Sequence, residues 1–174
     1  MKHKKYLNLN KFMLLLNSTE VNMHFLEIIN NIAKEEEIIM FVDMDGVIAS
    51  YEINKPFDFE NKRPLYNNIN IFKTLSKNKN IELHILSICK LNKQEQEKNN
   101  WLDCYAPFFK KEHRHILSRE KYSNNLAKIL KKNFLEEVKT NKKIIVVDDD
   151  NDVLYEINKN LKNIILFQDS ELID

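Results

Sequence analysis

Asp43 and Asp45 stand directly after the apolar run Ile38–Val42, and Gly46, the only glycine of the chain, follows them. A continuous apolar run of this length is typical of a strand that is buried on both faces. A buried strand that ends in two carboxylates and a sharp turn is poorly suited to core packing. It would, however, deliver oxygen ligands of the kind that Mg²⁺ prefers. We therefore expect an anionic metal site at this turn.

Two further apolar runs also end in polar groups. Ile144–Val147 is followed by the acidic stretch Asp148–Asp150, and Ile81–Leu86 is followed by Ser87. In an open sheet of parallel strands, ligands bind at the carboxyl ends of the strands. If the three runs are parallel neighbours, their polar ends meet at one edge. Taken alone, the acidic stretch would also be a good cap for the helix that follows it.

The order of the apolar runs indicates the fold class. Helical patterns alternate with strand-like runs, which is typical of βαβ crossovers and of an α/β, doubly wound, mostly parallel sheet. We expect about five strands, with a weaker one at His115–Leu117, and a helix with apolar positions from Val21 to Ile32 before the first strand. The other expected elements are the strand Ile164–Phe167 and the helices Asn68–Lys77, Lys93–Leu102, Asn124–Val138 and Asp152–Lys162.

Length and composition favour one globular domain. The chain has 174 residues and a formal net charge of +1, which argues against a dedicated nucleic-acid binder. Cys89 and Cys104 are too few for a disulfide framework or a four-cysteine zinc site. The apolar stretch Phe12–Leu16 is shorter than the core of a signal peptide, and no run is long enough to span a membrane. We predict a cytoplasmic protein with no membrane partner.

In its motifs the chain resembles the haloacid dehalogenase-like phosphohydrolase superfamily. The sequence DMDGV from Asp43 is similar to the first motif of that family, Leu86–Ser87 to the second, and VVDDD at Val146–Asp150 to the fourth. A lysine upstream of the last motif would be the third. Order and spacing agree over residues 38–167. DMDGV followed by an acidic pair is also similar to the 5′(3′)-deoxyribonucleotidase branch.

The resemblance implies a role for each carboxylate. Asp43 would be the nucleophile that forms an aspartyl-phosphate, and Asp45 would protonate the leaving oxygen and later activate water. Mg²⁺ would be held by Asp43, by the backbone carbonyl of Asp45 and by Asp149. Asp148 would lie behind the metal ligands, where it would help to orient them and to balance the charge of the site.

Ser87 and a lysine would bind the phosphoryl oxygens, on which charge accumulates in the transition state. Lys121 follows the short strand at His115–Leu117 and precedes a helix, which makes it the preferred candidate; Lys128 on that helix is the alternative. His113 and His115 together with Cys104 match no common spacing of zinc ligands.

The chain leaves little room for a cap domain. After the helix Asn68–Lys77 is subtracted, residues 50–80 leave about 20 residues for a cap, which is short for a substantial helical cap domain. A reduced or absent cap in this superfamily accompanies large substrates or oligomers that cover the site. Residues 1–36 would form an arm and a helix that packs on or covers the catalytic core, residues 37–174, or that makes a homo-oligomer contact.

The expected function is Mg²⁺-dependent hydrolysis of phosphate monoesters, with a small phosphorylated substrate such as a nucleotide. Tyr51, Phe57 and Phe59 follow the catalytic turn and would either stack on a base or pack the segment onto the core. Two alternatives stay open. The first is a capless phosphatase that acts on a macromolecule, such as a nucleic-acid end or a phosphoprotein. The second is a phosphate-binding module without catalysis.

Overall fold

The computed structural model describes residues 25–55, 57–122 and 125–172. The predicted N-terminal arm and the beginning of the predicted first helix lie outside these residues. Five parallel strands form one sheet in the order β3-β2-β1-β4-β5. The strands are β1 (Ile38–Val42), β2 (Ile81–Cys89), β3 (Arg114–Ser118), β4 (Lys143–Asp148) and β5 (Ile164–Gln168). The predicted α/β, doubly wound sheet is confirmed, and the strand before Asp43 is central.

The residues of β1 show why the central strand is apolar throughout. Met40 and Val42 face one hydrophobic cluster, and Ile39 and Phe41 face the other, so both faces of the strand are covered. All five residues of β1 are buried. A strand that is buried on both faces loses the alternation of polar and apolar residues, as the sequence pattern indicated.

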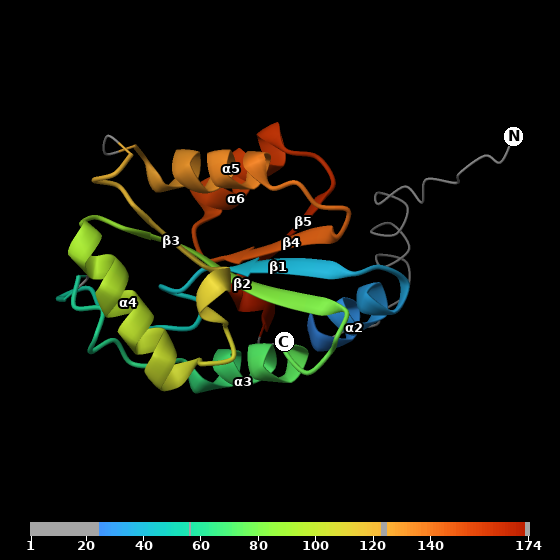
Figure 1. Ribbon diagram of the computed structural model, residues 1–174, viewed down its shortest axis with the longest axis horizontal. Helices are drawn as coiled ribbons and strands as arrows, with labels where there is room; N and C mark the ends of the chain where they lie inside the picture. Colours follow the sequence, from blue (N-terminus) through green and yellow to red (C-terminus); the bar gives the residue numbers. More distant parts are fainter. Residues whose placement is uncertain (1–24, 56, 123–124, 173–174) are drawn as a thin grey trace, which may run out of the picture.

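Helices cover both faces of the sheet, with α2 (Phe25–Glu35), α3 (Tyr66–Leu75) and α4 (Asn92–Tyr105) on one side and α5 (Ala127–Glu137) and α6 (Asn151–Asn160) on the other (Figure 1). Short 3₁₀ helices occur at Lys111–His113 (η1) and Asp169–Leu172 (η2). The ends of α3 to α6 differ from the predicted ends by one to three residues. None of the helices in the described part of the chain is long and apolar enough to span a bilayer.

Helix α2 is part of the main core. Phe25, Ile29 and Ala33 are buried, and the ring of Phe25 packs edge-on against Phe72 of α3 and Phe167 of β5, with centroids 6.4 Å and 5.0 Å apart. This helix packs on the core. A role of residues 1–36 in covering the site or in dimer formation stays a prediction.

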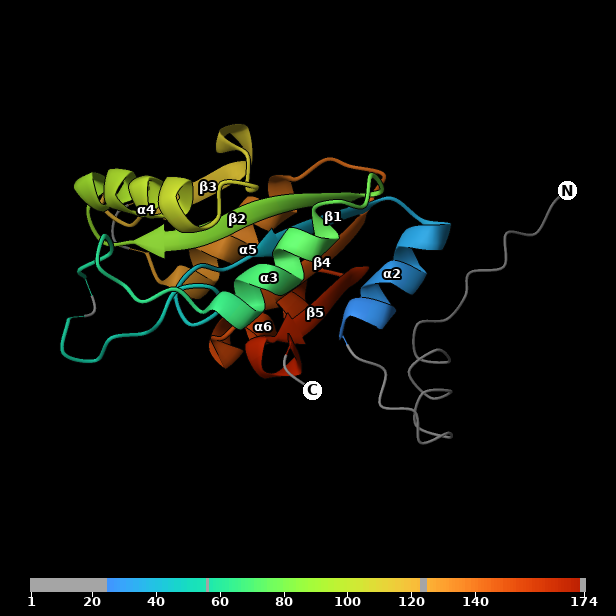
Figure 2. The same cartoon turned by 90° about the horizontal axis from the view of Figure 1, so that it is seen from below.

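The segment between β1 and α3 takes the place of a cap. Its described residues form turns and two isolated bridges, Asp45 to Ala49 and Ala49 to Pro64, with no helix among them. Figure 2 shows this segment extending from the molecule at the end where the arrowhead of β2 lies. The expected reduced cap is therefore a loop, and it lies at the carboxyl edge of the sheet.

Candidate active site

Three carboxylates meet at the carboxyl ends of β1 and β4. Oxygen atoms of Asp43, Asp148 and Asp149 all lie within 4.8 Å of one another. The backbone amide of Asp43 donates to the carbonyl of Val147 at 2.9 Å, which continues the pairing of β1 and β4 past the last residue of β1. Because the two strands are neighbours, carboxylates more than a hundred positions apart in the chain come together. Such an all-oxygen cluster could bind a metal ion.

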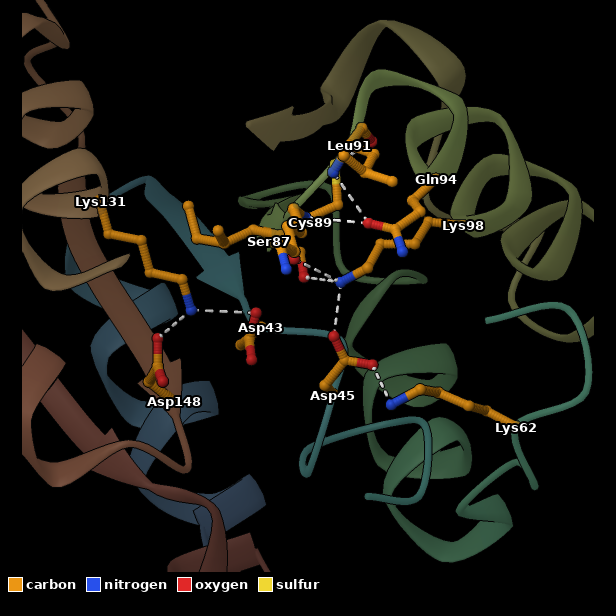
Figure 3. Close-up of polar contacts among 12 residues, drawn as sticks. Asp43, Asp45, Lys62, Ser87, Cys89, Leu91, Gln94, Lys98, Lys131 and Asp148 are labelled. Carbon is orange, nitrogen blue, oxygen red and sulfur yellow. Dashed lines mark hydrogen bonds and ion pairs between the residues drawn. The ribbon is translucent and has the colours of Figure 1, made fainter. Parts of the chain in front are cut away.

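Lys131 of α5 neutralises part of this cluster. Its ammonium lies 2.9 Å from Asp43 Oδ1 and 2.6 Å from Asp148 Oδ2, and its side chain is only 4% exposed (Figure 3). Burial opposes the charge on Lys131, but the two carboxylates outweigh it and raise the pKa of the ammonium. Lys131 is therefore a fixed positive charge beside Asp43.

The structure does not bring the predicted lysine to this position. Lys121 is half exposed and pairs with Glu95 at 2.7 Å, while Lys128, the alternative, lies 3.4 Å from Asp152. Lys121 follows β3, the edge strand that β2 separates from β1, whereas Lys131 is a buried residue on the face of α5 that packs on the sheet. The placement at Lys121 is corrected to Lys131.

The carboxylates of Asp43, Asp148 and Asp149 repel one another, and the ammonium of Lys131 offsets only part of this repulsion. Burial raises the pKa of Asp149 to about 7, and the charges of Asp43 and Asp148 contribute to the rise. Burial likewise raises the pKa of Asp148 to about 6, although Lys131 opposes it. Three carboxylates against one ammonium leave an excess of negative charge, which is the condition under which a divalent ion is bound rather than repelled.

Gly46 explains how Asp149 approaches the turn after β1. Its φ is +82°, a left-handed conformation that side chains other than glycine rarely adopt. A Cβ at this position would lie 2.1 Å from Asp149 Oδ2, far inside contact distance. The single glycine of the chain is therefore required twice, by the backbone turn and by the carboxylate packed against it.

Asp45 lies between two buried lysines. Lys98 Nζ contacts its Oδ2 at 2.5 Å, and Lys62 Nζ contacts its Oδ1 at 2.8 Å (Figure 3). Burial would raise the pKa of Asp45, but the charges of Lys98 and Lys62 outweigh it, and the pKa is lowered. Asp45 is therefore ionised at neutral pH. It can orient or deprotonate a water molecule, but it must first acquire a proton before it can donate one.

Lys62 also fastens the loop that replaces the cap. Its carbonyl accepts a hydrogen bond from Trp101 Nε1 at 2.8 Å, which ties the loop to α4. Phe59 is buried, with the ammonium groups of Lys62 and Lys98 5.0 Å and 4.5 Å from its ring centre. Tyr51 and Phe57 are exposed instead. Of the three aromatic residues after the turn, one packs the loop and two are free to meet a ligand.

Ser87 joins the site through Lys98. It is fully buried, and its Oγ accepts a hydrogen bond from Lys98 Nζ at 2.8 Å, while the same ammonium contacts Asp45. β2 continues to Cys89, so Ser87 lies inside the strand and not after its end as predicted. A further hydrogen bond from Lys98 to the carbonyl of Ile88, at 2.8 Å, fixes the ammonium in place.

The acidic stretch after β4 is divided between two roles. Asp150 caps α6, since its Oδ1 accepts a hydrogen bond from the amide of Asp152 at 2.8 Å. Asp148 Oδ1 accepts one from the amide of Asp150 at 3.1 Å. The helix-cap interpretation therefore holds for the third aspartate, while the first two face Asp43.

Sequence reasoning did not single out Lys62, Lys98 or Lys131, although a signal for two of them was present. Lys131 shares its helix stripe with Leu130 and Leu135, and Lys98 shares its own with Trp101 and Leu102. A lysine on the apolar stripe of a helix is buried unless it reaches the surface, and a buried lysine needs a carboxylate partner. Lys62 lies in the loop and has no such pattern.

Comparison with known proteins gives no relative by sequence: no family model and no curated protein matches the chain. Among solved structures, a chain of the Pnkp1/Rnl/Hen1 RNA repair complex superposes with a TM-score of 0.62 at 19% identity, over 76% of this chain and 42% of that one. A chain in a second structure of the Pnkp1/Rnl/Hen1 complex superposes with a TM-score of 0.61 at 18% identity, over 77% of this chain and 46% of that one. The fold is haloacid dehalogenase-like.

The class C acid phosphatase from Bacillus anthracis, solved with tungstate bound, has the same fold. It superposes with a TM-score of 0.52 at 15% identity, over 93% of this chain and 84% of that one. The chain spans less than half the length of the matched chains of the repair complex. At these identities the likeness establishes the haloacid dehalogenase-like core, and the chemistry has to be argued from the residues.

Proposed function

We propose that this protein is a Mg²⁺-dependent phosphatase that hydrolyses phosphate monoesters through an aspartyl-phosphate on Asp43. The observation that carries the proposal is the meeting of Asp43, Asp148 and Asp149 within 4.8 Å at the carboxyl edge of the sheet. Asp45, two residues after the nucleophile, supplies the separate acid/base group that such a reaction needs. The phosphatase among the similar structures supports the reaction class.

The donor set fits Mg²⁺. All three groups offer carboxylate oxygens, and the pKa of Asp149 is raised to about 7 by burial and by its acidic neighbours. Mg²⁺ binds one or two carboxylates and retains several waters. Asp43 and Asp149 would hold the ion, with the carbonyl of Asp45 as the third predicted ligand. When bound, Mg²⁺ supplies positive charge between Asp43 and the substrate dianion.

In the first step a carboxylate oxygen of Asp43 attacks phosphorus, and the bond from phosphorus to the ester oxygen breaks. The leaving oxygen departs with the bonding electrons and needs a proton. Asp45 is ionised because Lys62 and Lys98 lower its pKa, so it gives up a proton to the leaving oxygen only after binding one. The ammonium groups of Lys62 and Lys98 lie beside it and stabilise negative charge that develops there.

In the second step Asp45 takes a proton from a water molecule, which then attacks phosphorus. The bond between phosphorus and Asp43 breaks, inorganic phosphate is released, and the Asp43 carboxylate is restored. Lys131 stays beside Asp43 throughout, and its charge stabilises the negative charge that develops on the phosphoryl oxygens. An ionised Asp45 suits this step better than the first.

The proposal is tested with purified protein on p-nitrophenyl phosphate and a panel of mononucleotides. We expect phosphate release that requires Mg²⁺, is abolished by EDTA and is lost in Asp43→Asn. After a quench with acid, a ³²P-labelled substrate should leave label on wild-type protein and none on the variant. Turnover by Asp43→Asn at the wild-type rate would exclude Asp43 as the nucleophile. Phosphate binding without turnover would favour the non-catalytic module.

A macromolecular substrate is the second candidate, and one observation favours it. The loop that replaces the cap exposes Tyr51 and Phe57 beside the site, and Lys90 Nζ lies 5.7 Å from the centre of the Phe57 ring. Aromatic faces and a nearby cation are suited to a nucleic-acid strand. Two of the similar structures are of an RNA repair complex, which is consistent with an end-phosphorylated oligonucleotide.

The two substrate classes are separated by comparing kcat/KM for 3′- and 5′-phosphorylated oligonucleotides with kcat/KM for the matching mononucleotides. Phe57→Ala and Tyr51→Ala should each raise KM for oligonucleotides by about five- to a hundredfold, if each ring stacks on a base. It should leave p-nitrophenyl phosphate turnover unchanged. Equal turnover of both substrate lengths would favour the small substrate.

A further inference from the structure

Three of the five histidines of the chain gather at a second group of possible metal ligands. Glu82 and His84 lie two residues apart on β2 and share one face of the strand, next to Ile39 and Phe41 of β1. His113 ends η1, just before β3. Along the strands, Glu82 is level with a position four residues, about 13 Å, before Asp43, and His84 with a position two residues, about 7 Å, before it. The group shares no residue with the candidate active site.

The donor atoms of the three residues converge. Glu82 Oε1 lies 2.5 Å from His84 Nε2 and 3.8 Å from His113 Nε2, and all three groups have ligand atoms within 4.8 Å of one another. In a tetrahedral zinc site with bonds of about 2.0–2.1 Å, neighbouring ligand atoms are about 3.3 Å apart. The two measured distances bracket that value. The imidazole rings of His84 and His113 are nearly parallel, with centroids 4.1 Å apart. His113 must therefore tilt for the Nε2 atoms of both rings to point at one ion.

His115 fixes the orientation of the His84 ring through a hydrogen bond at Nδ1. Its Nε2 lies 2.9 Å from His84 Nδ1, on the opposite side of the ring from Glu82. His115 Nε2 can accept the Nδ1 proton of His84, and in that tautomer His84 Nε2 carries the lone pair that a metal ligand needs. Histidine ligands of metals are oriented by such a second hydrogen bond.

We propose that Glu82, His84 and His113 form a second metal site, which binds a transition-metal ion such as Zn²⁺, with His115 as the positioning residue. Two imidazoles and a carboxylate are a ligand set that zinc uses when its fourth position is open. The open position faces a cavity of about 280 Å³ that Glu82 and His113 line together with Phe108 and Lys110. A water molecule has room to complete the coordination there.

Lys142 limits the affinity of this site for a metal ion. Its ammonium lies 2.7 Å from Glu82 Oε2, the oxygen that faces away from the histidines. Oε1 stays available for the ion, but the nearby positive charge opposes a second cation. Replacement of Lys142 by methionine should therefore raise the affinity for the metal.

The two sites of the molecule should differ in the metals they take. Asp43, Asp148 and Asp149 offer oxygen only, which suits Mg²⁺, whereas imidazole nitrogen suits Zn²⁺, Co²⁺ or Ni²⁺. An excess of Mg²⁺ should occupy the first site and leave the second one free. Because the proposal depends on the second site alone, it stands or falls independently of the phosphatase reaction.

The test uses full-length, tag-free protein stripped of metal and titrated with Co²⁺ in an excess of Mg²⁺. We expect one equivalent of Co²⁺ to produce visible absorption bands of a four-coordinate ion, and one equivalent of Zn²⁺ to remove them. His113→Ala should lose affinity at least tenfold and keep its Mg²⁺-dependent phosphatase activity. Lys142→Met should bind more tightly than wild type.

Two controls identify the ligands. Asp43→Asn removes a carboxylate of the other site, and Cys104→Ser removes the exposed thiol, so both should keep the Co²⁺ spectrum. The proposal is overturned if wild-type protein shows no such spectrum. It is also overturned if His113→Ala binds Co²⁺ as tightly as wild type, or if the Cys104→Ser variant loses the bands.

Discussion

Replacement of Lys131 by methionine tests the candidate active site most directly. The ammonium of Lys131 lies 2.9 Å from Asp43 and 2.6 Å from Asp148, and the side chain is almost completely buried. Methionine is close to lysine in length, but it has neither the charge nor the hydrogen-bond donors. The variant therefore keeps the packing of α5 on the sheet and leaves two buried carboxylates facing each other without a counter-charge.

The expected effects follow from the burial of the pair. Removal of one partner of a buried ion pair costs about 3–5 kcal/mol of stability. For a protein of this size each kcal/mol shifts the melting temperature by about 2–4 °C, so we expect a fall of about 6–20 °C in EDTA. Mg²⁺ should recover part of it, because the ion supplies the missing charge. Loss of one fixed positive charge at the phosphoryl group should lower kcat by about 10²- to 10³-fold.

The assay is thermal unfolding with and without Mg²⁺, together with steady-state kinetics on p-nitrophenyl phosphate. Lys121→Met is the matched control, because it removes a lysine that pairs with Glu95 on the surface. We expect it to change stability by less than about 1 kcal/mol and to leave kcat unchanged. If Lys131→Met keeps the wild-type kcat while Lys121→Met loses it, the reassignment of the lysine is wrong.

Three further outcomes can be measured. Gly46→Ala should weaken Mg²⁺ binding in calorimetry by at least about tenfold, because the new Cβ would lie 2.1 Å from Asp149 Oδ2; unchanged affinity would contradict the packing. Lys98→Met should raise the pKa of Asp45 and move the basic limb of the kcat/KM profile to higher pH, because Asp45 is the proton donor in the first step; an unmoved limb would show that Asp45 is not the titrating group. In EDTA, wild-type protein should lose stability relative to His115→Gln as the pH falls from 6.5 to about 4. The folded-state pKa of His115 is lowered to about 4, so the unfolded chain binds this proton more readily in that window. The raised pKa values of Asp148 and Asp149 act in the opposite direction in both proteins and cancel in the comparison. Urea unfolding should show a change of roughly 1–2 kcal/mol in the difference between the two proteins, after allowance for solvent screening.

The sheet could be predicted because its strands are unusually uniform. β1 and β4 carry continuous apolar runs that end abruptly at an aspartate, while β2 alternates at its start and carries Ser87 near its end. In a parallel sheet all such ends lie on one side, so the juxtaposition of Asp43 with Asp148 and Asp149 follows from the topology alone. Their positions depend on strand order and hardly on side-chain detail.

The lysines could not be placed with the same certainty. Which lysine reaches a carboxylate depends on the rotation of a helix about its axis. The order of motifs along the chain, on which Lys121 was chosen, does not give that rotation. Lys121 has the expected position in the sequence, yet it points to Glu95 on the surface, while Lys131 points inward from α5. The abundance of lysine in this chain hid the few that occupy apolar stripes.

The second cluster was beyond the reach of spacing rules for a similar reason. His113 and His115 were compared with Cys104, which is near them in sequence but exposed and apart from the cluster. Their partners Glu82 and His84 come from β2, about thirty positions earlier, and meet them only because β2 and β3 are neighbours. Zinc-ligand spacings describe sites within one short segment, whereas this group spans two strands.

The charges at the carboxyl edge form two groups of opposite sign. Asp43, Asp148 and Asp149 share one ammonium, that of Lys131, while Asp45 alone faces two, those of Lys62 and Lys98. With all groups ionised, the four carboxylates outnumber the three lysines by one, so a phosphate dianion is repelled.

A bound divalent cation changes the sign of the whole edge from minus one to plus one, and the dianion is then attracted. Substrate binding should therefore require the metal before any chemistry occurs. Equilibrium dialysis with a phosphate monoester and Asp43→Asn can show this, because the variant cannot turn the ester over. Asparagine also removes one carboxylate, so the metal-free edge is close to neutral and the bound metal makes it about plus two. Binding of the ester should still rise strongly when Mg²⁺ is added, and ester binding that is independent of Mg²⁺ would refute this reading of the charges.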